Sequence, residues 1–137
     1  MSFSMRGQAN ANALTNLVAN FRRGVMGGGA AAVRIITDRA RQGMQEGPHS
    51  GFHYRSLPNR SSAPGEYAAN QSGRAMGSIG GTNSLWQMRV WMRAPHAGYI
   101  EEGTSRMGAR PTLGNAVRDT EGQVRATLGE FVWISIR

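Results

Sequence analysis

The chain lacks cysteine, lysine and any long apolar run. Without cysteine it has no disulfide, no thiolate zinc site and no cysteine nucleophile, a composition compatible with a reducing cytosol. No apolar stretch approaches the ~20 residues that cross a bilayer, and the N-terminus has no apolar signal segment. We therefore expect a soluble protein made in the cytoplasm, with neither Sec export nor a membrane partner.

All sixteen basic residues are arginine, and with eight acidic residues they give a net charge of +8. Arginine pairs with carboxylates and phosphates and stacks on aromatic rings, so this composition suits protein interfaces and nucleic acid equally. The arginines are scattered from Arg6 to Arg137, with no run beyond Arg22-Arg23. A nucleic-acid stripe usually clusters more than this. A basic nucleic-acid-binding module therefore stays as the alternative function.

The length of 137 residues favours a single domain, 1–137. Its periodicity predicts an α+β fold, with an antiparallel sheet of about four strands packed with two N-terminal helices and one C-terminal helix. The first helix is indicated by one apolar stripe: Leu14, Leu17, Val18 and Phe21. The second is indicated by another: Met26, Val33, Ile36, Ala40 and Met44. Its start is left open, because Gly27 to Gly29 each cost about 1 kcal/mol in a helix. The C-terminal helix is expected to follow Pro111 and to stop at Gly129.

Alternating apolar and polar residues predict the strands. The clearest is 84–93, with Trp86, Met88, Val90 and Met92 on its apolar face. A partner strand is expected at 75–80, with a Gly-Gly-Thr-Asn turn between the two. Further strands are expected at 96–101 and at the terminal FVWISIR, 131–137.

A long loop is expected at 48–72, where Ser, Pro, Gly, Asn and Arg predominate. A connection of this length in a compact domain is either disordered or functional. Phe52, Tyr54, Leu57 and Tyr67 would anchor it, which favours a functional loop over a plain linker.

The sequence offers no catalytic, cofactor or metal site. A phosphate loop requires a lysine after its glycines and a strand before them, and Gly27 to Gly29 have neither. Ser78 does not fit the nucleophile-elbow pattern either. His49 and His53 with Glu46 stand in a loop rather than on a rigid helix, so ordinary loop histidines are favoured. We expect no enzyme.

The most informative segment is AGYIEEGTSRMGARPTL, 97–113. It joins an aromatic anchor to a loop with two carboxylates, two guanidinium groups and two glycines, and then to a helix start at Pro111. Because an ordered loop with both charge signs suits recognition of a like subunit, we interpret it as an interface element. The expected interface residues in it are Tyr99, Glu101, Glu102, Arg106 and Arg110.

This segment resembles the tail-completion, or head-tail joining, proteins of long-tailed bacteriophages, in which an aromatic-x-E-x-GTS-R-x-x-ARP-x-L string recurs. A second block, RSSAPGEYAANQSGRAMGSI at 60–79, is similar to their RS-x-PGE…A…TGR-L-x-x-SI pattern, with Ser72 where threonine is usual and Ala75 where leucine is usual. This block adds Arg60, Glu66, Tyr67 and Arg74 to the expected interface.

The resemblance implies a structural neck protein of the virion, assembled in the host cytoplasm. Its subunits would form a homo-hexameric ring at the top of the tail tube, which joins the tail to the head. The implied partners are a connector or portal-side neck protein, a tail terminator or tail-tube protein, and DNA in the lumen. The resemblance also implies that the long loop projects outward to touch neighbours.

Overall fold

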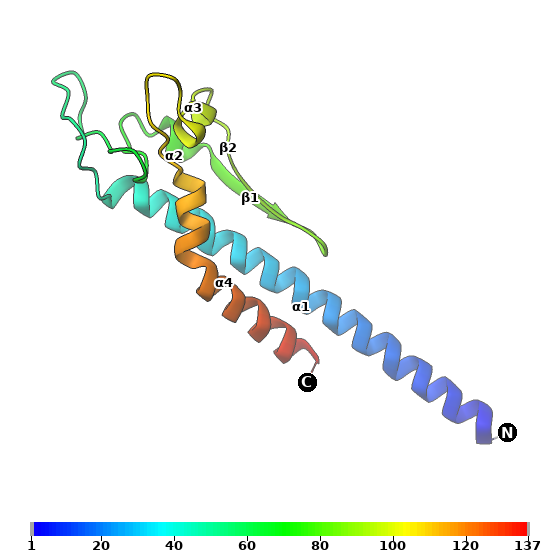
Figure 1. Ribbon diagram of the computed structural model, residues 1–137. Helices are drawn as coiled ribbons and strands as arrows, with labels where there is room; N and C mark the ends of the chain where they lie inside the picture. Colours follow the sequence, from blue (N-terminus) through cyan, green and yellow to red (C-terminus); the bar gives the residue numbers. More distant parts are fainter. Residues whose placement is uncertain (1, 137) are drawn as a thin grey trace.

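The computed structural model describes the backbone of residues 2–136 and the side chains of residues 11–136. The elements within this range are α1 (Ser2–Glu46), α2 (Arg74–Gly77), β1 (Ile79–Asn83), β2 (Met88–Met92), α3 (Ala97–Glu102) and α4 (Thr112–Ile136). Figure 1 shows α4 running back along the much longer α1, while the short helices and the loops gather near the C-terminal end of α1. The α+β expectation is confirmed in this broad form.

The prediction of two N-terminal helices was wrong, because α1 is one helix that continues through Gly27 to Gly29. The reason lies in α4. A Cβ atom at Gly24 would lie 2.9 Å from the carbonyl oxygen of Phe131, and one at Gly28 would lie 3.1 Å from the Phe131 Cβ. The glycines let the two helices approach closely, and this packing offsets their low helix propensity.

The sheet has two strands in the described range, where about four were predicted. β1 and β2 pair antiparallel, with Ile79 opposite Met92 and Gly81 opposite Val90. The predicted apolar face of β2 is confirmed at Met92, which is buried, and at Val90, which is half-buried, while Arg89 is exposed. It is not confirmed at Met88, which is exposed, and Trp91 on the opposite face is half-buried.

The hairpin turn lies further along the chain than predicted. The Gly-Gly-Thr-Asn segment belongs to β1, and the chain turns at residues 84–87, where the Ser84 N–H donates to the Gln87 carbonyl at 2.8 Å. Residues 75–77 of the predicted partner strand belong instead to the short helix α2. Trp86, predicted on the apolar face, stands in the turn and is 92% exposed.

The two other predicted strands are helices. Residues 97–102 form α3, and residues 131–136 form the last turns of α4; Arg137 lies outside the described residues. Phe131 and Ser135 stand four positions apart and both face α1 at Gly24. Residues four apart share a face in a helix, so this segment packs on α1 as a helix although its sequence also alternates like a strand. Gly129 does not stop α4.

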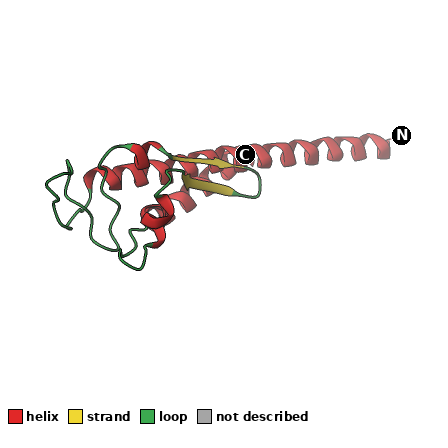
Figure 2. Ribbon diagram, turned by 90° about the horizontal axis from the view of Figure 1, so that it is seen from above, coloured by secondary structure: helices red, strands yellow, loops and turns green. Residues whose placement is uncertain are grey.

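The core lies where α1, α4 and the hairpin meet. Its α1 members follow four-residue spacing, and Figure 2 shows the hairpin lying along the same helix. Two hydrogen bonds hold it there: Arg41 Nη2 donates to the Ile79 carbonyl at 2.7 Å, and Asn83 Nδ2 donates to the Met26 carbonyl at 3.0 Å. The buried apolar residues are Ala32, Ile36, Ala40, Met44, Tyr67, Ala68, Ala75, Ile79, Met92, Ala94, Ala97, Ala116 and Val124.

Candidate functional site

The two sequence blocks that carry the family resemblance lie against one another. The Gly65 N–H donates to the Ala109 carbonyl at 2.8 Å, and Arg110 Nε donates to the Ser62 carbonyl at 3.0 Å. Residues 60–72 of the second block belong to the predicted long loop, and the segment between α1 and α2 contains no helix or strand. Residues that stand almost fifty positions apart therefore share one surface at the end of the molecule where α1 ends.

The segment between α3 and α4, 103–111, folds into a tight turn, which we call the motif turn. Thr104 and Met107 exchange backbone hydrogen bonds of 2.8 and 3.3 Å. Gly103 has a φ of 76°, and a Cβ there would lie 2.7 Å from the Ala109 nitrogen. Only glycine fits this position without strain, so Gly103 fixes the path of the turn.

Glu101 caps α4 within its own subunit. Its Oε1 accepts a hydrogen bond of 2.7 Å from the N–H of Leu113, in the first turn of α4. Burial raises the pKa of the Glu101 carboxyl, while the N–H groups of Leu113, Gly114 and Thr112 act in the opposite direction. A carboxylate at a helix N-terminus satisfies N–H groups that otherwise have no partner. The sequence suggested that the Glu101 carboxylate contacts a neighbouring subunit, but in the structure it binds the start of α4 in its own subunit.

The two arginines of the motif turn differ sharply. Arg110 is half-buried and donates to two carbonyls of its own subunit, those of Ser62 at 3.0 Å and Gly108 at 2.8 Å. Arg106 is exposed, and its guanidinium has no polar partner among the described side chains and backbone. Arg110 braces the loops, whereas Arg106 presents a free cation.

A cleft of about 570 Å³ separates the long loop from the motif turn. Arg106 and Arg110 line it from the motif turn, and the rest of the lining is apolar residues, hydroxyl residues and the amide residue Gln71. Such a cleft suits an extended segment of another chain that carries an acidic group. Its lining includes Tyr54, Leu57, Ser62, Ile100, Arg106 and Met107.

Glu66 holds the long loop together. It accepts hydrogen bonds from the Ser50 hydroxyl at 2.5 Å, the Ser50 N–H at 3.0 Å and the Ala63 N–H at 2.7 Å. The hydroxyl bond is the largest cause that lowers the pKa of Glu66 below its ordinary 4.5, against a smaller opposing effect of burial. Glu66 therefore closes the loop upon itself.

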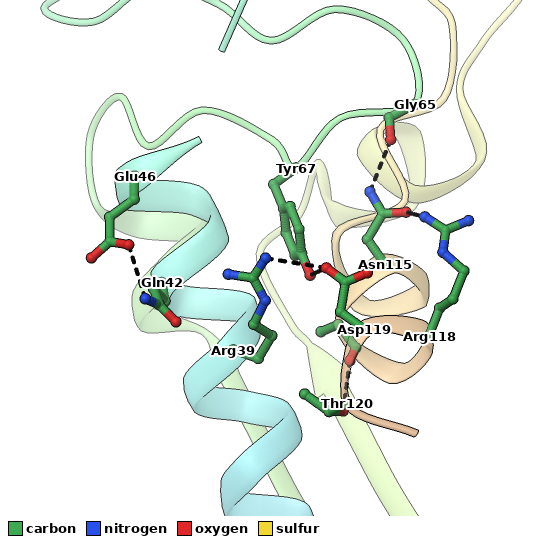
Figure 3. A network of polar contacts seen from close by, with 10 residues as sticks. Arg39, Gln42, Glu46, Gly65, Tyr67, Asn115, Arg118, Asp119 and Thr120 are labelled. Carbon is green, nitrogen blue, oxygen red and sulfur yellow. Dashed lines mark hydrogen bonds and ion pairs between the residues drawn. The ribbon is translucent and has the colours of Figure 1, made fainter. Parts of the chain in front are cut away.

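Tyr67 is buried at the centre of the polar network drawn in Figure 3. Its hydroxyl donates to Asp119 Oδ2 at 2.7 Å, and Arg39 Nη2 binds the same oxygen at 3.1 Å. The Arg39 guanidinium also lies 4.9 Å from the centre of the Tyr67 ring. Burial raises the pKa of Tyr67 to about 12, and the bond to Asp119 adds to this rise. Tyr67 thus ties the loop to both α1 and α4.

The remaining predicted interface residues lie on the outside. Tyr99 is 63% exposed, and the Glu102 and Arg74 side chains are exposed too. Arg60 is exposed and reaches the Gly51 carbonyl at 3.4 Å. Together with Arg106, these residues keep their side chains available to a neighbour.

Sequence reasoning missed Asp119, Arg39 and Asn115. Asn115 Nδ2 donates to the Gly65 carbonyl at 2.9 Å and so joins α4 to the long loop. Asn115 and Asp119 stand on α4 and Arg39 on α1, far in the sequence from one another's helix and from their loop partners Gly65 and Tyr67, and no local pattern brings them together. The spacing of residues along the sequence therefore could not have identified these three side chains.

Residues 11–136 contain no cluster of three or more His, Cys, Asp or Glu side chains arranged to hold a metal ion. Within the described chain, no helix is both long and apolar enough to cross a membrane. Comparisons with protein-family models, curated protein sequences and solved structures gave no match.

Proposed function

We propose that the chain is a structural virion protein of a long-tailed bacteriophage, a tail-completion subunit that joins the tail to the head. The observation that carries the proposal is the contact between the two blocks that resemble this family. Arg110 and Ala109 of the first block bind Ser62 and Gly65 of the second. Two motifs that each resemble the family would be expected to contribute to one surface, and their direct contact supports the proposal.

The exposed residues of that surface support a role in assembly. Arg106 and Glu102 present opposite charges, and Tyr99 presents an exposed aromatic ring. Aromatic and arginine side chains are enriched at interfaces between proteins. A ring needs two different faces that complement one another, and a surface with a cleft, a free cation and a free carboxylate offers such a face.

In the proposed assembly, six copies form a ring on the tail tube, and the cleft faces a neighbour or the adjacent ring. The subunits would be made in the host cytoplasm and then become part of the neck of the virion. The partners would be the connector side of the head, the tail terminator or tube, and DNA in the lumen.

The test is a phage genome in which the coding sequence of this chain is deleted and then supplied from a plasmid. We expect separate heads and tails without the chain, joined particles with it, and the chain in purified joined particles. Joined particles formed at normal yield without the chain would contradict the proposal. Tight binding of the purified chain to duplex DNA, with a steep loss of affinity as salt rises, would favour the nucleic-acid-binding alternative instead.

A further inference from the structure

The N-terminal half of α1 leaves the rest of the molecule. α1 has 45 residues and α4 has 25. Figure 1 shows the blue N-terminal end of α1 projecting alone past the end of α4, and Figure 2 shows the same projection toward the end marked N. Residues 11–19 are all exposed. An isolated helical segment of this length is marginal in water unless its apolar face is packed. We call residues 11–23 the arm.

The arm carries an apolar face that α4 does not cover. The face of α1 that meets α4 at Gly24 and Gly28 continues toward the N-terminus, but α4 ends at Ile136. The five apolar side chains around this point form what we call the arm patch, and four of them match the stripe predicted from the sequence. They are Leu14, Leu17, Val18, Phe21 and Ile136, with exposures of 62, 48, 44, 49 and 36%.

The exposed area is large for a monomer. A hollow beside the arm patch adds Phe131 and Ile134, which are 40 and 59% exposed. Together these seven large side chains leave an apolar surface of several hundred Å², the size that marks an interaction site. It approaches the ~800 Å² that one partner contributes to a standard interface.

The charges around the patch point to a second copy of the chain as its occupant. Arg23 and Glu130 both line the hollow, both are exposed, and neither forms an ion pair within residues 11–136. With a cation on α1 and a carboxylate on α4 beside the apolar stripe, Arg23 of one copy can pair with Glu130 of the next, a contact between two different faces as a ring requires.

The polar face of the arm argues against the other occupants. The charged residues of the arm are Arg22 and Arg23, next to the part of α1 that packs on α4. Residues 11–21 contain none, and Asn12, Asn16 and Asn20 follow one another at four-residue spacing. Helices that lie on membranes are rich in lysine and arginine on this face, and nucleic acid requires cations there. An uncharged amide face beside an apolar stripe fits helix-to-helix packing instead.

We infer that the arm patch is a surface through which copies of this chain bind one another. The inference rests on the proposed function in one respect, because a ring requires contact between copies, and it assigns that contact to the arm rather than to the motif turn alone. The motif turn and its cleft then remain available for the adjacent ring.

The experiment uses two matched valines of the full chain. Val18 in the arm patch is 44% exposed, and Val117 on α4, outside the patch, is 46% exposed. We would measure sedimentation equilibrium of wild type, Val18→Arg and Val117→Arg over a range of concentrations, with circular dichroism to check folding. We expect wild type and Val117→Arg to associate alike, and Val18→Arg to dissociate at least about tenfold more readily, a change of about 1.4 kcal/mol.

Equal association of Val18→Arg and wild type would overturn the inference, and so would a wild type that stays monomeric at every concentration. If Val18→Arg is unfolded, the milder Val18→Thr takes its place under the same criteria. A monomeric wild type that binds phosphatidylglycerol vesicles and loses this binding in Val18→Arg would assign the patch to a membrane surface, against the inference.

The same variants separate this inference from the proposed function. Val18→Arg phage that join heads to tails at normal yield would overturn the arm contact and leave the proposed function standing. If self-association depends on Val18 but heads and tails join without the chain, the arm contact stands and the proposed function is overturned.

Discussion

The Tyr67 hydroxyl donates to the Asp119 carboxylate at 2.7 Å, and this bond joins the long loop to α4. Asp119 also binds Arg39 of α1 at 3.1 Å, so one carboxylate connects three parts of the chain. The Tyr67 ring meanwhile lies over Gly43 of α1, where any Cβ atom would collide with it. Tyr67 therefore contacts both helices from the loop, and the hydrogen bonds of Asn115 to Gly65 and of Ala68 to Thr112 attach the same loop to α4.

Tyr67→Phe should lower the free energy of unfolding by about 1 kcal/mol, because it removes one partly buried hydrogen bond while the ring stays in place. Urea unfolding followed by circular dichroism would measure this change. Tyr54→Phe is the control, since Tyr54 is 51% exposed and its hydroxyl has no partner in the described structure. Its effect should stay within about 0.5 kcal/mol. Equal effects of the two substitutions would show that the bond to Asp119 does not stabilise the fold.

Two carboxylates should give opposite pH dependences. The folded-state pKa of Glu66 is lowered below 4.5, so its stabilising effect is present above that pH and is lost as the pH falls through the folded value. Burial raises the folded-state pKa of Glu101, so stability is lost as the pH rises from 4.5 through the folded value. Compared with wild type, Glu66→Gln should lose relative stability as the pH rises from 3 to 7, and Glu101→Gln should gain it. Melting temperatures across this range would test both signs, and parallel curves would contradict them.

Gly24→Ala and Gly129→Ala should change stability in opposite directions. Alanine at Gly24 would press on the backbone oxygen of Phe131 and force α1 and α4 apart, at a typical cost of about 1 to 3 kcal/mol. Nothing lies within 4 Å of a Cβ at Gly129, so alanine there should stabilise α4 by up to about 1 kcal/mol. Thermal unfolding measures both changes. A stabilising Gly24→Ala would mean that the helices do not pack so closely.

The extent to which the sequence predicts this fold follows from what each residue contacts. The stripe of Val33, Ile36, Ala40 and Met44 was read correctly because helical spacing is visible in the chain itself. Two helices were predicted in place of α1, with the start of the second left open at Gly27 to Gly29, because the reason for these glycines becomes visible only once α4 packs against them. FVWISIR was misread as a strand because β-branched and aromatic residues suit both periods over so short a segment.

The candidate site was predicted in part for the same reason. The motif turn and the long loop carry local signals in glycine, proline and charge, and both lie where expected. The roles of Glu101 and Arg110 were not predictable, since their partners Leu113 and Ser62 are known only from the folded contacts. The charge of a side chain in the sequence indicates that it will bind a polar partner. Whether that partner lies in the same subunit or in a neighbour is known only from the folded structure.

Val90→Asp should destabilise the hairpin, whereas Arg89→Ala should not. Val90 is half-buried against the core, and a carboxylate placed there loses water without gaining a partner, at a cost of about 1 to 3 kcal/mol. Arg89 is exposed and bonds only Gln87, two residues away. Differential scanning calorimetry of the two variants would test this. Equal melting temperatures would contradict the assignment of Val90 to the buried face of β2.

Arg106→Ala and Arg110→Ala should separate assembly from folding. Arg110→Ala removes two hydrogen bonds to the Ser62 and Gly108 carbonyls, so the motif turn and the long loop should loosen, at about 1 kcal/mol per bond lost. The melting temperature of the purified subunit should therefore fall.

Arg106→Ala breaks no such bond, so the subunit should melt as wild type does. If Arg106 binds a buried carboxylate of a neighbour, its loss costs about 2 to 5 kcal/mol per contact, repeated around a ring. Complementation of the deletion phage should then yield few joined particles with Arg106→Ala. Normal yields from this variant would show that Arg106 is a rim residue, worth about 0 to 1 kcal/mol, and that the motif turn serves the fold of its own subunit.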